Sequence, residues 1–121
     1  MNPAGTAPIP TYDWPAHHAW MSPERTALID LYSGRRWSYE RVNERVGRLA
    51  GYFLAGCGVG RGDRVAILAP NSADYLKVQF ACIRLGVIFL PVTWRLVVPE
   101  LECIVNDATP GILINDRQFE R

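Results

Sequence analysis

Residues 56–69 read GCGVGRGDRVAILA, and this glycine-rich run followed by an apolar run of strand length decides the fold. In a dinucleotide-binding loop the glycines instead follow a strand and open a helix, whose N-terminal amides point at the phosphates. Here residues 42–54 place apolar side chains at helical spacing, so the glycines follow a helix. We therefore interpret residues 56–62 as a turn from a helix into a strand. A Walker loop is also excluded, because the only lysine, Lys77, lies inside a helical pattern.

Helical and strand patterns alternate from this turn outward. Ser38 and then Asn71 or Ser72 are good helix N-caps, and Pro99 suits the first turn of a third helix. The three helical patterns end at the glycines that begin at residue 56, at Gly86, and at residues 108–111. Near-continuous apolar strands over residues 64–69, 87–92 and 112–114 separate them. This order indicates an α/β fold with a mainly parallel sheet and right-handed crossovers.

The N-terminal part of the chain has a different character. Residues 1–22 carry four prolines and no periodicity, so we expect an irregular arm that Trp14 and Trp20 pin to the body. Residues 26–30 and 35–39 have the composition of short strands and are separated by Tyr-Ser-Gly, which predicts a hairpin.

Composition excludes several functions. A net charge of +1, with scattered arginines, argues against nucleic acid or an anionic membrane as the main partner. The longest apolar run is too short to span a bilayer, and the first residues lack the pattern of a signal peptide. Wide spacing of the cysteines predicts reduced, mostly buried thiols, no zinc site and a cytoplasmic protein; they are Cys57, Cys82 and Cys103. Adjacent histidines at 17 and 18 are interpreted as a surface pair.

Several short segments, in this order and at these spacings, resemble the N-terminal part of the adenylate-forming acyl-CoA synthetases, the AMP-binding superfamily. The resemblance covers about residues 23–117, and the segments read PERTAL, WSYE, GVGRGDRVAI, PNS, RLGVIFLPV, WRL, PEL and ND. The WRL segment after the proline-containing strand is similar to the fatty-acyl-CoA ligase branch. Thr93 departs from that branch, which often has asparagine there.

The resemblance implies a two-step reaction with ATP, Mg²⁺ and CoA. A carboxylate, expected to be a fatty acid, attacks the α-phosphate of ATP to give an acyl adenylate and pyrophosphate, and the thiol of CoA then displaces AMP. Preorganised positive charge and Mg²⁺ stabilise such a transition state.

The family's catalytic segments have no counterpart in residues 1–121, so we assign no catalytic residue and no metal ligand. We expect residues 1–22 to form the arm and residues 23–121 to form the N-terminal portion of an AMP-binding domain that ends before the nucleotide site. Such a fragment is expected to be inactive alone, to bind none of these cofactors tightly, and to need the missing C-terminal part or a complementing chain.

The resemblance places one segment of this chain near the CoA path, the residues Thr93, Trp94 and Arg95. An arginine there could meet a phosphate. The plainer interpretation, which we favour, is that Trp94 and Arg95 pack and pair at the end of a strand.

Three other functions remain open on the sequence alone. The chain could be one half of a split ligase, or a non-catalytic binding or interaction module of α/β fold. It could also be an unrelated nucleotide-binding α/β domain, although the position of its glycines and the lack of a phosphate-binding lysine oppose this.

Overall fold

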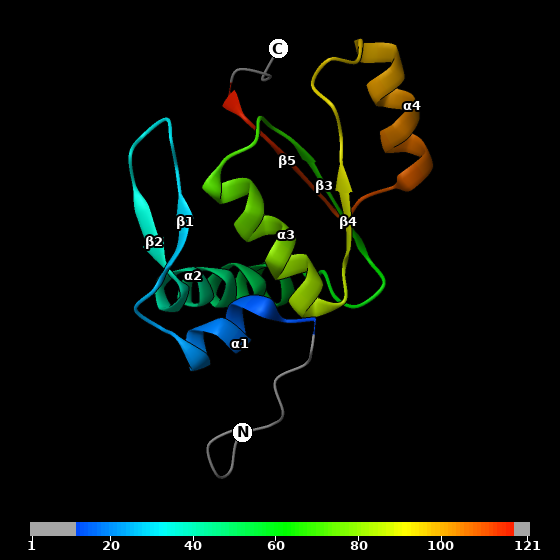
Figure 1. Ribbon diagram of the computed structural model, residues 1–121. Helices are drawn as coiled ribbons and strands as arrows, with labels where there is room; N and C mark the ends of the chain where they lie inside the picture. The colour runs from blue at the N-terminus through cyan, green and yellow to red at the C-terminus, as the bar shows by residue number, and fades with distance from the viewer. Residues whose placement is uncertain (1–11, 118–121) are drawn as a thin grey trace.

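The computed structural model describes residues 12–117 and contains helices, a small hairpin and a parallel sheet (Figure 1). The order along the chain is α1 (Trp14–Met21), β1 (Thr26–Ile29), β2 (Arg36–Ser38), α2 (Tyr39–Gly51), β3 (Arg64–Leu68), α3 (Ala73–Leu85), β4 (Ile88–Pro91), α4 (Val98–Ala108) and β5 (Ile112–Asn115). Helix α2 continues as one π-helical turn, η1 (Tyr52–Gly56).

The two sheets confirm the predicted fold class. Strands β1 and β2 pair antiparallel as a hairpin, and the three-stranded sheet has the order β4-β3-β5 with parallel pairing throughout. Val65 in the central strand lies opposite Phe89 on one side and Ile112 on the other. Helix α3 connects β3 to β4, and α4 connects β4 to β5, as the alternating pattern requires.

Local hydrogen bonds explain where the two long helices begin and end. The side chain of Ser38 accepts a hydrogen bond from the N–H of Arg41 at 3.2 Å, and that of Ser72 accepts one from Tyr75 at 3.1 Å. Both are the expected N-caps, since they satisfy amides that have no partner within the helix. Helix α3 ends at Gly86, whose φ of 71° suits glycine best.

The core is formed mainly by side chains of α2 and its extension, of α3 and of β3, and α3 is seen between α2 and the parallel sheet in Figure 1. Helix α2 contributes an apolar stripe that continues into the π-helical turn. The residues of this core cluster with at most 2% of their surface exposed are Val42, Val46, Phe53, Val65, Ile67, Ala81 and Cys82, and Ala66 of β3, outside the cluster, is also fully buried.

The expectation of an irregular arm over residues 1–22 was wrong for its described part, because Trp14–Met21 form α1. Asp13 caps this helix and is only 6% exposed. Its carboxylate accepts hydrogen bonds from Arg84 of α3 at 2.8 and 3.1 Å. Of the two expected anchors, Trp14 is 62% exposed and Trp20 is 39% exposed. Residues 1–11 and 118–121 lie outside the described range.

One expectation about burial also needed correction. Cys82 is buried, but Cys57 and Cys103 are exposed, so the thiols are not mostly buried. On α3, Leu76 is 36% exposed, whereas Lys77 is only 6% exposed.

Candidate functional site

The carboxyl ends of β3 and β4 lie at one edge of the parallel sheet, where ligands approach most open α/β proteins. A hollow of about 320 Å³ opens there. The residues that follow β3 form one wall and those that follow β4 form the other, and the lining residues are Ala69, Pro70, Asn71, Tyr75, Pro91, Val92, Thr93 and Trp94. The amino end of α3 begins beside the hollow, because Ser72 is its N-cap.

The structure brings the three residues selected from the sequence together in one turn after β4. The side chain of Thr93 accepts a hydrogen bond from the N–H of Arg95 at 3.3 Å, and its carbonyl oxygen accepts one from Leu96 at 3.4 Å. Trp94 is 48% exposed, and the guanidinium carbon of Arg95 lies 5.3 Å from the centre of its ring. Thr93 and Trp94 line the hollow, while Arg95 is exposed beside it.

The side chains around this hollow are of kinds that bind ligands in other proteins. It offers an indole face, a hydroxyl and a nearby guanidinium, which are groups that stack on rings and meet phosphates. Tyr75 is the titratable side chain among the described lining residues, and burial raises its pKa. Its ring packs edge-on against Phe89, with the centroids 5.6 Å apart. The tyrosine therefore supports the wall as a neutral, packed side chain.

The glycine-rich turn lies at the other end of the sheet, before β3, as predicted. The carboxylate of Asp63 accepts a hydrogen bond from the N–H of Gly60 at 2.9 Å, and the N–H of Gly62 donates to the carbonyl of Gly86 at 3.0 Å. These bonds tie the turn to the end of α3. The turn contributes to chain reversal and stands away from the edge where the candidate site opens.

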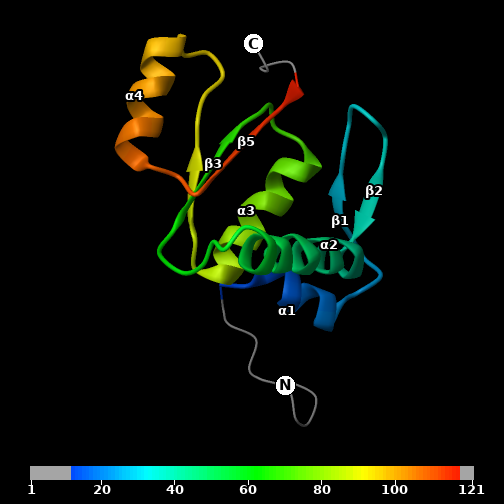
Figure 2. The ribbon, with the colours of Figure 1, turned by 180° about the vertical axis from the view of Figure 1, so that it is seen from behind.

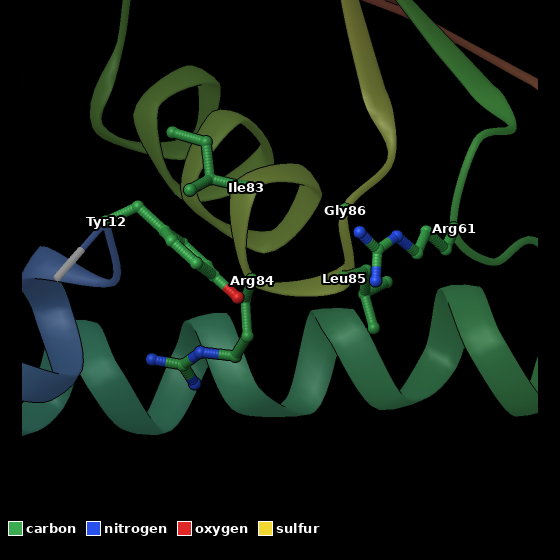
Figure 3. A pocket seen from close by; sticks show the side chains of 6 residues that line it. All are labelled: Tyr12, Arg61, Ile83, Arg84, Leu85 and Gly86. Carbon is green, nitrogen blue, oxygen red and sulfur yellow. The ribbon is translucent and has the colours of Figure 1, made fainter. Parts of the chain in front are cut away.

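A second hollow, of about 420 Å³, lies beside the end of α3 (Figure 3). Its lining side chains include two arginines, Arg61 and Arg84. The guanidinium of Arg84 is turned toward α2 and donates a hydrogen bond to the side chain of Asn43 on that helix at 2.5 Å. It also donates to the carboxylate of Asp13, the N-cap of α1. Because this cation is already satisfied by the protein, we assign it the structural role of joining α1, α2 and α3.

The sequence did not predict the contacts that the side chain of Lys77 makes. Its ammonium nitrogen lies 3.3 Å from the centre of the Trp37 ring and 3.3 Å from a carboxylate oxygen of Asp74. Burial lowers its pKa, and the Asp74 carboxylate partly opposes this. The spacing of Asp74 and Lys77 hints at their ion pair, but contact with a tryptophan from the hairpin follows only from the tertiary fold.

Residues 12–117 contain neither a cluster of metal-binding side chains nor a membrane-spanning helix. They contain no group of three or more histidine, cysteine or acidic side chains arranged to hold a metal ion. No helix among them is both long and apolar enough to cross a membrane.

Parallel strands, helical crossovers and a hollow at the strands' carboxyl ends define an α/β protein whose candidate site lies at one edge of its sheet. The chain belongs to the AMP-binding enzyme family, because the model of that family matches residues 16–121. Similar solved structures include a fatty acyl-CoA synthetase of Mycobacterium tuberculosis, with a TM-score of 0.80 and 30% identity over 86% of this chain and 21% of that one. O-succinylbenzoate coenzyme A synthetase of Bacillus subtilis, solved with AMP, has a TM-score of 0.80 and 31% identity over 89% and 28% of the two chains.

Curated relatives agree with this membership. Feruloyl-CoA synthase of an Amycolatopsis species is 42% identical over 102 residues, which are 84% of this chain and 20% of that protein. Indoleacetate–CoA ligase of Aromatoleum aromaticum is 36% identical over 107 residues, or 88% and 20% of the two proteins. This chain therefore spans about a fifth of the length of the curated relatives it matches.

Proposed function

We propose that residues 1–121 form the N-terminal segment of an AMP-forming carboxylate–CoA ligase. The observation that carries the proposal is the family match over residues 16–121. In the reaction, a carboxylate oxygen attacks the α-phosphorus of ATP and pyrophosphate leaves. The sulfur of CoA then attacks the acyl carbon, and AMP leaves with the bonding electron pair.

We propose a carboxylic acid with an apolar body as the substrate. The relatives at 42% and 36% identity are named for aromatic acids, and a solved relative at 30% is named for fatty acids. A fatty acid remains our first candidate, with ferulate and indoleacetate next. The cytoplasm is the proposed location, because the reaction consumes ATP and CoA and the cysteines of the chain are free thiols.

ATP and Mg²⁺ are proposed to bind chiefly to segments outside this chain. The hollow after β3 and β4 has no carboxylate among its lining residues, so it does not fit Mg²⁺, which prefers oxygen ligands with negative charge. We propose instead that Thr93, Trp94 and Arg95 contact CoA, since their hydroxyl, ring face and guanidinium are adjacent and exposed at the sheet edge.

The test of the function is carboxylate-dependent exchange of labelled pyrophosphate into ATP. The polypeptide encoded by the complete gene should catalyse exchange with at least one acid from a panel of fatty acids, ferulate and indoleacetate. The 121-residue chain alone should give no exchange and no calorimetric signal with ATP. Lack of exchange by the complete product with every acid of the panel would refute the proposal.

The same assay isolates the proposed CoA contact. Arg95→Ala should leave pyrophosphate exchange unchanged, because that half-reaction does not involve CoA. It should raise the KM for CoA in thioester formation about tenfold, the effect of losing one charge-assisted hydrogen bond. Arg36→Ala, which removes an exposed arginine on β2, is the matched control and should change neither step. An unchanged KM for CoA in Arg95→Ala would show that Arg95 does not contact CoA and has only a structural role.

A further inference from the structure

A small hollow lies where α1, the first strand of the hairpin, α2 and α3 meet. In Figure 2, α1 runs alongside α2, and the hairpin that links the two helices stands at one end of the pair. The hollow has a volume of about 180 Å³, and we call it the aromatic pocket. Its lining residues are Trp14, Pro15 and His18 from α1, Ala27 and Leu28 from β1, Tyr39 and Val42 from α2, and Phe80 from α3.

Aromatic rings from three helices form much of the wall of this pocket. The imidazole of His18 lies against the phenol ring of Tyr39, with their centroids 4.9 Å apart and their planes at 32°. Trp14 of α1 and Phe80 of α3 add an indole and a phenyl ring. Aromatic rings attract one another in offset-stacked and edge-to-face arrangements, beyond the effect of the area they bury. The wall therefore favours a flat aromatic ligand over an aliphatic ligand of the same size.

The wall carries polar groups but no fixed charge. Among the described residues that line the pocket there is no aspartate, glutamate, lysine or arginine. Within residues 12–117, neither the hydroxyl of Tyr39 nor the imidazole of His18 has a hydrogen-bond partner. A charged ligand would lose its hydration here without meeting an opposite charge, and that loss is costly. A neutral ligand with an O–H or N–H group can instead donate a hydrogen bond to one of these two side chains.

The volume of the pocket selects the size of the ligand. An apolar cavity of about 150 Å³ in another protein is large enough to hold benzene. The aromatic pocket, at about 180 Å³, therefore has room for a substituted benzene ring or an indole but not for a nucleotide. It shares no lining residue with the hollow after β3 and β4, so it is a separate candidate site.

We propose that the aromatic pocket binds a neutral, flat aromatic molecule with one hydrogen-bond donor, of the phenol or indole class. The ring of the ligand packs against the aromatic wall, and its O–H or N–H donates to the imidazole of His18 or the phenol oxygen of Tyr39. Because α1, the hairpin, α2 and α3 all contribute to the wall, the bound ligand joins α1 to the rest of the fold and stabilises it. The inference goes beyond the proposed function and does not depend on it.

Binding of indole to the 121-residue chain, followed by saturation-transfer NMR, tests the proposal. Indole should bind with a dissociation constant of about 1 mM or below, as expected for so small a ligand. Cyclohexanol lacks an aromatic face and benzoate carries a charge, so each should bind about tenfold more weakly than indole. The same titration on the polypeptide encoded by the complete gene repeats the test with the neighbouring segments present.

Two tryptophans of the same helix provide a variant and its matched control. Trp14 lines the pocket and is 62% exposed, so Trp14→Ala should weaken indole binding about tenfold without unfolding the chain. Trp20 is 39% exposed and does not line the pocket, so Trp20→Ala should change the affinity by less than about twofold. Ala27→Leu, which fills the pocket from β1, should abolish binding.

Three results would each overturn the proposal. The first is no binding of indole by the wild-type chain and by the complete gene product. The second is binding of cyclohexanol or benzoate as tight as that of indole, which would show that neither the rings nor the lack of charge selects the ligand. The third is an equal loss of affinity in Trp14→Ala and Trp20→Ala, which would place the indole outside the aromatic pocket.

Discussion

Replacing Asp13 with alanine should destabilise the chain by about 3 kcal/mol. The change removes the N-cap of α1, where the carboxylate accepts from Ala16 at 3.3 Å, and such caps contribute about 1 kcal/mol. It also removes both carboxylate contacts of Arg84, at 2.8 and 3.1 Å. Since the carboxylate is 8% exposed and the guanidinium 22%, the pair lies between the exposed and buried limits and contributes about 2 kcal/mol.

Urea unfolding followed by far-ultraviolet circular dichroism measures this loss. With a slope of about 2 kcal/mol per molar urea, the midpoint should fall by about 1.5 M. In an Arg84→Met background, Asp13→Ala should cost only about 1 kcal/mol, because the ion pair is already absent and the cap alone is lost. A shift below about 0.5 kcal/mol in the wild-type background, or an equal cost in both backgrounds, would refute the anchoring of α1 by this residue.

Two further predictions concern stability. Burial raises the pKa of the Cys82 thiol to about 11 from 9.0, so the unfolded chain loses this proton first and the unfolding free energy should fall by about 2 kcal/mol between these pH values. Urea titrations of Cys82→Ala at the same pH values should show a shallower decline, and an identical decline would contradict this. Gly86→Ala should lower the free energy of unfolding by about 1–2 kcal/mol, because the φ of Gly86 is 71°. Gly51→Ala should raise it by about 0.5 kcal/mol, because Gly51 has a helical φ of −60° and open space around it. Thermal unfolding of the two variants tests these opposite signs.

The elements that could be predicted are those whose signals are local. Ser38 and Ser72 are followed by helical apolar spacing, and the strands after each helix are short apolar runs between turn residues. Parallel pairing followed from the order of these elements. Helix α1 was missed because its eight residues, WPAHHAWM, have no clear apolar face. The signal that could have found it is Asp13 as an N-cap with proline in the first turn.

The candidate site was only partly predictable. The turn at Thr93–Arg95 came from motif resemblance, and its place at the sheet edge follows from being at the carboxyl end of β4. Tyr75 was not predicted as a site residue. Its side chain lines the same hollow only because α3 begins beside the carboxyl ends of β3 and β4. The positions of Lys77 and Arg84 depend on Trp37 and Asp13, which lie 40 and 71 residues away in the chain, so no local pattern could reveal them.

Because Lys77 is the single lysine of this chain and is buried, limited proteolysis can report on the opening of α3. A lysine-specific protease has one possible cleavage site in the sequence, and that site lies within α3 with its side chain 6% exposed. Cleavage therefore requires α3 to open, and its rate under slow proteolysis follows the population of opened molecules. One cut, yielding two fragments, thus reports the integrity of the helix that contacts α2, the hairpin and the parallel sheet.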